Sequence, residues 1–158
     1  MQTSQLLPPA SLWRRLAAMV YDSFLVFAIW MIVGFLVLSL FGIEQARNVE
    51  GEIVTLDPLY SFVLFTCMLL SCIVFFCVFW MVSGQTLGMQ AWKIKIQNHD
   101  GSTITLKQSL LRCLFAPVSL ILFGLGYFYM YFNEQRDSLH DRISGSRVVL
   151  LDSHASPL

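Results

Sequence analysis

Residues 59–82 read LYSFVLFTCMLLSCIVFFCVFWMV and contain no Asp, Glu, Lys or Arg. As a helix this stretch is about 36 Å long, which exceeds the hydrocarbon thickness of a bilayer, about 30 Å. Tyr60 and Trp80 stand near its two ends, where aromatic side chains favour the boundary between lipid and water. Because the whole chain is 56% hydrophobic and only 13% charged, an ordinary soluble domain is excluded and a membrane-spanning helix is predicted.

A second apolar stretch precedes it, at residues 16–41. A helix that runs from Leu12 to the end of this stretch is about 45 Å long, more than the bilayer requires. Its first turns, with Arg14 and Arg15, are therefore expected at the membrane interface. The alternative is a cleaved signal peptide, but the apolar core of such a peptide is only about 7 to 15 residues long. We predict an uncleaved membrane anchor.

Charged residues are distributed unevenly around these two stretches. The connection between them, residues 42–58, is acidic, whereas the flanking segments carry the basic residues Arg14, Arg15, Lys93, Lys95, Lys107 and Arg112. The positive-inside rule then places the N-terminus and residues 83–112 in the cytoplasm. Since the net charge is zero, no overall basic field is available to hold a nucleic acid, and none is expected as a partner.

Residues 91–106 have the pattern of a small cytoplasmic β-hairpin. Apolar Trp92, Ile94 and Ile96 alternate with polar residues, Asn-His-Asp-Gly supplies a turn, and apolar residues alternate with threonines after it. Because a hairpin of two strands is marginally stable alone, we expect it to pack on the helix ends or to pair with a third strand at residues 147–151.

A third apolar segment, residues 110–132, follows a capping-box pattern formed by Thr105 and Gln108. Pro117 and a Gly-Leu-Gly sequence interrupt it, so it either crosses the membrane once with a kink or turns back as a re-entrant hairpin. Its length favours one crossing, which places the tail, residues 134–158, outside the cytoplasm. Re-entry keeps that tail in the cytoplasm.

The predicted fold class is an all-α membrane protein. It has about three transmembrane helices, of which the third is kinked or re-entrant, and a small cytoplasmic β-hairpin, all within one domain. Three of the cysteines, Cys67, Cys72 and Cys77, are spaced so that they do not share a helix face, and Cys113 stands apart from them. We therefore expect apolar packing residues and no metal site.

Asp22 is a carboxylate inside the first apolar stretch. Arg15 precedes it by seven residues and lies on nearly the same helix face, but the rise between the two is about 10 Å. A direct pair is strained in a straight helix, so we expect Asp22 to meet a partner on another segment, with Arg112 or Arg142 as candidates. Two roles stay open for Asp22: a proton or cation site or gate, and a structural ion pair between helices.

Three motifs occur in order along the chain: RLAAMVYD near its start, GQTLGMQAWKIKI followed by DGSTITLKQSLLR in its middle, and LHDRISGSRVV near its end. Together they resemble the RDD family of small bacterial membrane proteins, over residues 12–150. The resemblance gives Arg15, Asp22 and Asp141 as the arginine and two aspartates that name the family. It implies a multi-pass protein of the bacterial cytoplasmic membrane that takes part in transport of an undefined ligand. Met89 departs from the pattern, because the family often has a basic residue there.

Glycines mark the ends of two predicted helices. Ser138 can cap a short helix that runs through Ile143 and ends at Gly145. Gly84 and Gly88 form a Gly-x-x-x-Gly pattern, which inside a membrane span would indicate close helix contact. Because the pattern lies just past the second span, helix termination and a tight turn are predicted for both.

Asp141 belongs to the short helix, and two roles are open for it. It is either a cap and dipole partner of that helix, or it meets Arg15 at the membrane surface in one polar cluster with Asp22. His140 is expected on the surface, because one imidazole and one carboxylate without further ligands do not make a metal site.

Two functions fit these features, and the sequence favours transport over the alternative of an accessory protein. A transporter would use Asp22 as an ion or proton site, and it would have to be a homo-oligomer, because three spans cannot enclose a pathway. An accessory or scaffold protein would use the same charges to hold its helices together and would contact a membrane partner protein through its cytoplasmic parts. An enzyme is not expected, since no catalytic spacing, phosphate loop or metal-ligand cluster occurs, and no cofactor is predicted.

Overall fold

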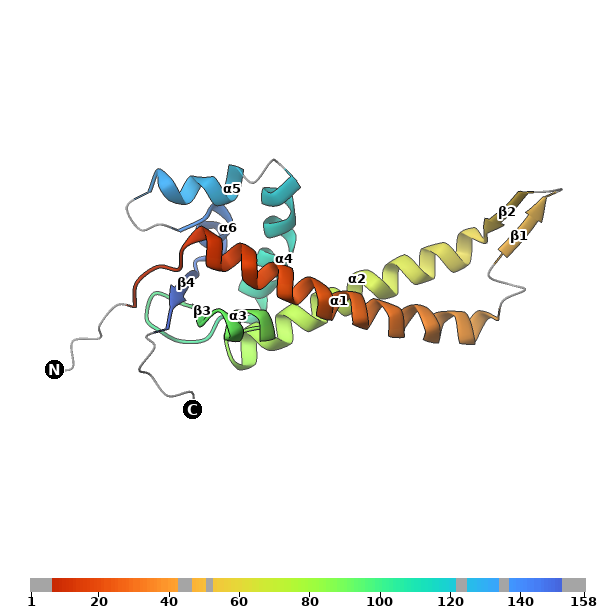
Figure 1. Cartoon of the computed structure of the whole chain (residues 1–158), viewed down its shortest axis with the longest axis horizontal. Coiled ribbons are helices and arrows are strands. Elements are labelled where there is room, and N and C mark those ends of the chain that lie inside the picture. The colour runs from red at the N-terminus through yellow and green to blue at the C-terminus, as the bar shows by residue number, and fades with distance from the viewer. Residues whose placement is uncertain (1–6, 43–46, 51–52, 122–124, 134–136, 152–158) are drawn as a thin grey trace. The chain divides into compact units, whose positions relative to one another are not determined.

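The computed structural model of the chain describes residues 7–42, 47–50, 53–121, 125–133 and 137–151. It divides into two compact units, which we call the anchor unit, residues 23–75, and the head unit, residues 1–22 and 76–158. Two long helices, α1 (Leu12–Phe41) and α2 (Pro58–Val82), contribute residues to both units (Figure 1). Among the described residues these are the helices long and apolar enough to cross a membrane, as predicted for the first two apolar stretches.

The anchor unit is held together by apolar contacts and a few satisfied polar groups. Val37 and Tyr60 form its buried core. The indole Nε1 of Trp30 donates to the backbone carbonyl of Met68 at 3.0 Å, which satisfies a polar group that lipid could not. The helix α2 begins at its proline, and Asp57 before it accepts hydrogen bonds from the first free backbone N–H groups of the helix.

The connection between the two spans contains strands that the sequence patterns did not predict. Strands β1 (Arg47–Glu50) and β2 (Ile53–Leu56) pair antiparallel, with Arg47 opposite Leu56. They form a two-stranded hairpin within the anchor unit.

The head unit surrounds a second small sheet. Strand β3 (Ile94–Gln97) pairs antiparallel with β4 (Arg147–Leu150), and Pro9 bridges to Val149 on the other side of β4. Around the sheet lie α3 (Leu87–Ala91), α4 (Leu106–Ile121), α5 (Leu125–Phe128), the 3-10 helix η1 (Tyr129–Tyr131) and α6 (Leu139–Ser144). The core joins the buried faces of both strands to the helices and contains Ala18, Trp80, Met89, Ile94, Ile96 and Val148.

The predicted hairpin at residues 91–106 is wrong in its second half. The turn forms, with the Asn98 backbone N–H donating to the Ser102 carbonyl at 2.9 Å, but no strand follows it. Thr105 instead begins α4, where its backbone N–H and hydroxyl donate to Gln108 Oε1 at 2.9 and 3.0 Å. The capping box therefore prevails over the alternating pattern, and β3 takes its partner from residues 147–150, within the predicted third strand.

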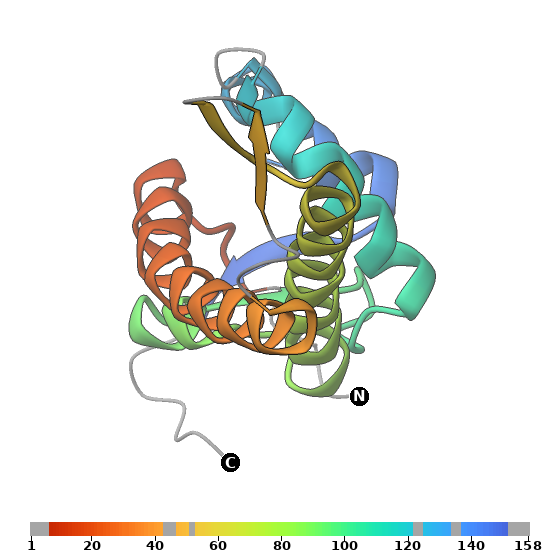
Figure 2. The same cartoon turned by 90° about the vertical axis from the view of Figure 1, so that its right-hand side faces the viewer.

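The chain returns to the sheet after the third apolar segment. Strands β3 and β4, which precede and follow residues 110–132, are hydrogen-bonded neighbours. The helix α4 ends at Ile121, and α5 packs back against it. Gly126 allows this return, because a Cβ there would overlap Ser119. Figures 1 and 2 both show α4 lying across the direction of the first turns of α1 within the head unit.

Candidate functional site

Asp141 is fully buried in the first turn of α6. Its Oδ2 accepts a hydrogen bond from the backbone N–H of Ser138 at 3.0 Å and another from the Ser138 hydroxyl at 2.6 Å. Gly145 ends the helix in a left-handed conformation with φ 64°. The short capped helix thus forms where the sequence predicts it, one residue longer than expected, and Asp141 closes its start.

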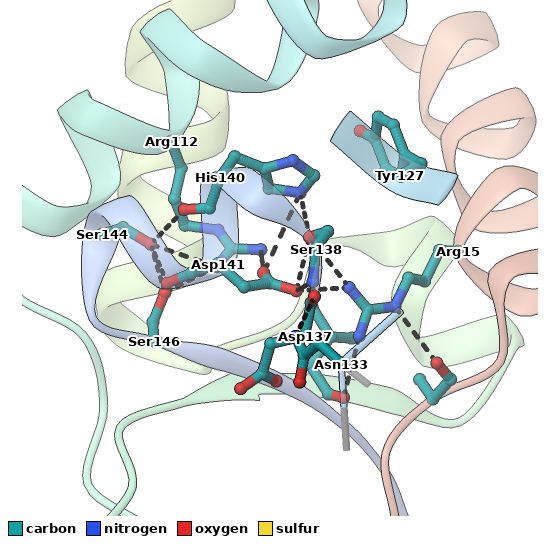
Figure 3. Close-up of polar contacts among 12 residues, drawn as sticks. Arg15, Arg112, Tyr127, Asn133, Asp137, Ser138, His140, Asp141, Ser144 and Ser146 are labelled. Carbon is teal, nitrogen blue, oxygen red and sulfur yellow. Dashed lines mark hydrogen bonds and ion pairs between the residues drawn. The ribbon is translucent and has the colours of Figure 1, made fainter. Parts of the chain in front are cut away.

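Two arginines from distant segments converge on Asp141 (Figure 3). Nη1 of Arg15, on α1, lies 2.5 Å from Oδ2 of Asp141, and Nη2 of Arg112, on α4, lies 2.6 Å from Oδ1. Both arginine side chains are 4% exposed. We call Arg15, Arg112 and Asp141 the ion cluster.

Other nitrogen atoms of the same two guanidinium groups also donate hydrogen bonds inside the head unit. Nε and Nη2 of Arg15 donate to the backbone carbonyls of Ala10 and Val148 at 3.2 and 3.4 Å. Nη1 of Arg112 donates to Ser146 Oγ at 2.6 Å. The ion cluster therefore connects α1, α4 and α6 with the segments that flank β4.

The surroundings of Asp141 fix its charge. Burial by itself would raise the pKa of this carboxyl group, but the guanidinium groups of Arg112 and Arg15 outweigh burial and hold the pKa well below its usual range. Asp141 is therefore an ionised carboxylate between two cations. It acts both as a cap and as the partner of Arg15, the two roles that the sequence left open.

His140 is buried, so the expectation of a surface histidine is wrong. Its Nε2 lies 3.0 Å from the Ser138 hydroxyl, and its ring packs on Tyr127 with 4.7 Å between the ring centroids. Because the Ser138 hydroxyl donates its proton to Asp141, His140 must carry its own proton on Nε2 and donate. Burial and the two nearby guanidinium groups lower the pKa of His140 to about 4.

Asp22 has separate partners from those of the ion cluster. Its Oδ2 accepts from the Thr86 hydroxyl at 2.5 Å, and its Oδ1 accepts from the Gly88 backbone N–H at 2.9 Å. Thr86 is itself the N-cap of α3 and accepts from the Met89 backbone N–H at 3.2 Å. Asp22 thus fixes the start of α3 to α1.

The two arginines proposed as partners of Asp22 are engaged elsewhere. Arg112 binds Asp141, and Arg142 is exposed and donates to the hydroxyl of Tyr129 at 2.5 Å, with its guanidinium over the same ring. The partner of Asp22 does lie on another segment, but it is a hydroxyl and a backbone N–H. A threonine at an N-cap position before LGMQA was the sequence signal for it.

The two predicted turn glycines have different roles. Gly84 follows α2 with φ 73°, and its N–H donates to the Trp80 carbonyl at 3.1 Å, as expected of a helix terminator. Gly88 lies inside α3, where a Cβ would overlap the carbonyl oxygen of Ala18 and stand 2.8 Å from Oδ1 of Asp22. For Gly88 the prediction of a terminator is wrong, because the residue permits close contact between α3 and α1.

Replacing Gly88 by Ala should therefore lower the free energy of unfolding by about 1–3 kcal/mol, since the added methyl group pushes α3 away from Asp22. The measurement is thermal unfolding of the purified protein in detergent. Gly34→Ala is the matched control, because the atom nearest to a Cβ there is 4.0 Å away. Equal unfolding temperatures for the two variants would contradict the proposed contact.

A pocket of about 80 Å³ adjoins the ion cluster. Arg15, Asp22, Arg112 and His140 line it together with apolar side chains from the core. It has room for a few water molecules. Within the described ranges, no group of three or more His, Cys, Asp or Glu side chains is placed to hold a metal ion.

The model of the RDD family matches residues 9–145, which is most of the chain. The chain belongs to the RDD family. A curated relative, "Uncharacterized protein RP437" of Rickettsia prowazekii (strain Madrid E), is 33% identical over 94 residues, which cover 58% of this chain and 51% of that protein. The chain thus matches about half the length of this relative. No solved structure matches the chain.

The arginine and two aspartates that name the RDD family do not share one set of contacts in this chain. Arg15 and Asp141 form an ion pair across 126 positions of sequence, whereas Asp22 holds α3. No pattern in the sequence indicated Arg112 as the second partner of Asp141. The Ser-x-x-Asp pattern at the start of α6 was the only local signal at this site, and it indicates a cap rather than an ion cluster.

Proposed function

We propose that this RDD protein is a membrane-anchored accessory protein, with α1 and α2 as its anchor and with buried charges that are structural. The observation that carries the proposal is that each carboxylate oxygen of Asp22 and Asp141 is already within 3 Å of a partner in the head unit. A site that exchanges protons or cations during transport needs a carboxylate that can release its partners. The contacts of these two aspartates instead hold four helices together, α1, α3, α4 and α6.

The head unit is proposed to lie in the cytoplasm of a bacterium and to contact a membrane partner protein there. Two spanning helices return the chain to the side on which it starts, and the pairing of Pro9 with Val149 is consistent with this. The basic residues that flank the two spans favour the cytoplasm for that side.

Ion- or proton-coupled transport by a homo-oligomer is the second candidate. One observation favours it: Asp22 lines a pocket together with Arg15 and Arg112, and a pocket with charged walls is a common start of an ion path. Two spans in one chain cannot enclose a pathway, so this function requires several copies.

Flux through reconstituted vesicles separates the two candidates. We expect no cation or proton flux above protein-free vesicles for the natural chain or for Asp22→Asn. The substitution should instead lower the free energy of unfolding by about 1–3 kcal/mol, because Asn cannot accept the hydrogen bond of the Thr86 hydroxyl with a charged oxygen.

Asp100→Asn is the control, since Asp100 is exposed on the turn after β3 and should leave stability unchanged. Flux by the natural chain that Asp22→Asn abolishes, at unchanged fold and oligomer size, would overturn the accessory function and support transport.

A further inference from the structure

The outer face of α4 is apolar at four positions between Leu106 and Val118. Exposed side chains recur at every fourth position, which places them on one side of the helix. We call Leu106, Leu110, Leu114 and Val118 the α4 stripe; each is between 43% and 62% exposed. In water such a stripe is unfavourable, and contiguous exposed apolar surface of this kind indicates an interaction site.

The opposite face of α4 is polar and buried. Ser109, Arg112 and Ser119 are each at most 5% exposed, and Arg112 takes part in the ion cluster. A soluble core helix has its apolar side inward, so α4 has the reverse arrangement. Its polar side is buried within the head unit, and its apolar side is exposed in the part of the chain that the structure describes.

The direction of α4 distinguishes it from the spanning helices. It lies across the first turns of α1 (Figures 1 and 2), and its 16 residues give a length of about 24 Å, less than the hydrocarbon core. The same compact unit contains residues 12–22 of α1 and residues 76–82 of α2, which are the ends of the two long helices. A helix that is too short to span a bilayer and apolar on one face is typical of a helix that lies along the membrane surface.

We propose that α4 is an interfacial helix that lies in the plane of the membrane, with the α4 stripe inserted between lipid acyl chains of one leaflet. The segment from residue 110 to residue 132 then neither crosses the bilayer nor enters it end-on. An interfacial α4 stays on the same side of the membrane as β3. This arrangement explains how the chain can return after α4 to pair β4 with β3. An amphipathic helix at this boundary typically inserts its apolar face by about 5–10 Å.

Lipid fits the α4 stripe better than a second copy of the chain. Four side chains on one helix cover far less than the roughly 800 Å² that each partner contributes to a stable interface. The exposed charged side chains in the described part of residues 106–143 are the basic Lys107 and Arg142, which suit the anionic surface of a bilayer. Exposed Phe128, Tyr131 and Phe132 add aromatic side chains that favour the same boundary.

Depth measurements along the α4 stripe test the proposal. A spin label is placed by cysteine substitution at one stripe position at a time in a variant without its native cysteines, reconstituted into phosphatidylcholine and phosphatidylglycerol vesicles. Collisions with oxygen and with a water-soluble nickel chelate then give the depth of each label. Asp100, on the exposed turn, serves as the reference in water, and Leu70, exposed in the middle of α2, as the reference in lipid.

We expect the four stripe labels to favour oxygen over nickel, to differ in depth by less than about 5 Å, and to lie shallower than Leu70. A helix along the membrane normal would spread the same labels over about 18 Å. Such a spread, or nickel access equal to that at Asp100, would overturn the proposal. Exclusion of both reagents together with spin coupling between chains would also overturn it, in favour of a second copy.

A second experiment tests the same contact in a chain that keeps its native cysteines. A photo-cross-linking amino acid replaces Leu114, and its adducts show what the α4 stripe contacts. Adducts with lipid support the proposal, whereas adducts with a second copy or with water alone contradict it. Ser102, exposed on the turn after β3, is the matched position at which no lipid adduct is expected.

Discussion

Replacement of Asp141 by Asn is expected to lower the free energy of unfolding by about 3–5 kcal/mol, the largest effect of any single substitution in the head unit. The carboxylate lies between Arg15 and Arg112, all three side chains are at least 96% buried, and removal of its charge leaves two guanidinium groups that repel each other away from water. Asn also gives Ser138 a weaker acceptor for its backbone N–H. The loss should spread from α6 to α1 and α4.

Chemical unfolding of the purified protein in detergent measures this effect. Asp100→Asn removes the same charge from an exposed turn and should leave the unfolding curve unchanged. A second comparison uses Arg142→Gln, which removes an exposed arginine of the same short helix from outside the ion cluster. If Asp141→Asn unfolds at the same denaturant concentration as these two controls, the ion cluster does not stabilise the fold.

Stability is also expected to depend on pH through His140. Its pKa is about 4 in the folded protein against 6.5 for a free side chain, so in this window the unfolded chain binds the additional proton. The contribution of neutral His140 is therefore complete above pH 6.5 and is lost as the pH falls towards 4. At about 1.4 kcal/mol for each unit of pKa difference, the loss amounts to about 3 kcal/mol.

Unfolding at a series of pH values between 4 and 7.5, compared with His140→Gln, tests this dependence. Gln can still donate to the Ser138 hydroxyl but does not titrate, so its stability should vary less between pH 6.5 and 4. The test compares the natural chain with His140→Gln at each pH. Burial raises the pKa of Asp137, so Asp137 changes stability with pH in the opposite sense to His140. Because Asp137 is present in both proteins, its effect cancels in the difference between their free energies of unfolding. His99→Gln, on the exposed turn, should retain the natural dependence. Parallel curves for the natural chain and His140→Gln would show that His140 is not buried in its neutral form.

The features that follow from nearby residues were predictable. The length and the lack of charge of two apolar stretches were sufficient to predict α1 and α2, because the cost of burying charge in lipid leaves few alternatives. The caps at Thr105 and Ser138 were sufficient to predict the starts of α4 and α6, since capping depends on residues three apart. Three short motifs were also sufficient to predict the family.

Local patterns failed where two good local structures competed. The alternation after the turn favoured a second strand, while the capping box favoured a helix, and in the structure the capping box prevails and Ile104 before it packs into the core. The third apolar segment was ambiguous for a similar reason, because its length suits a crossing but its breaks suit a return. The pairing of β3 with β4 favours the return, and no pattern within the segment contains this information.

The site itself combines both kinds of information. The sequence by itself identified Asp22 as a carboxylate inside an apolar stretch, with Arg15 on nearly the same helix face, and the resemblance to the family motifs added Asp141. Only the tertiary structure decided their partners: Arg112 and Arg15 for Asp141, and Thr86 with Gly88 for Asp22. The physical reason is that these contacts join positions 29 to 126 residues apart, so their geometry is fixed by how the helices pack and not by any local spacing.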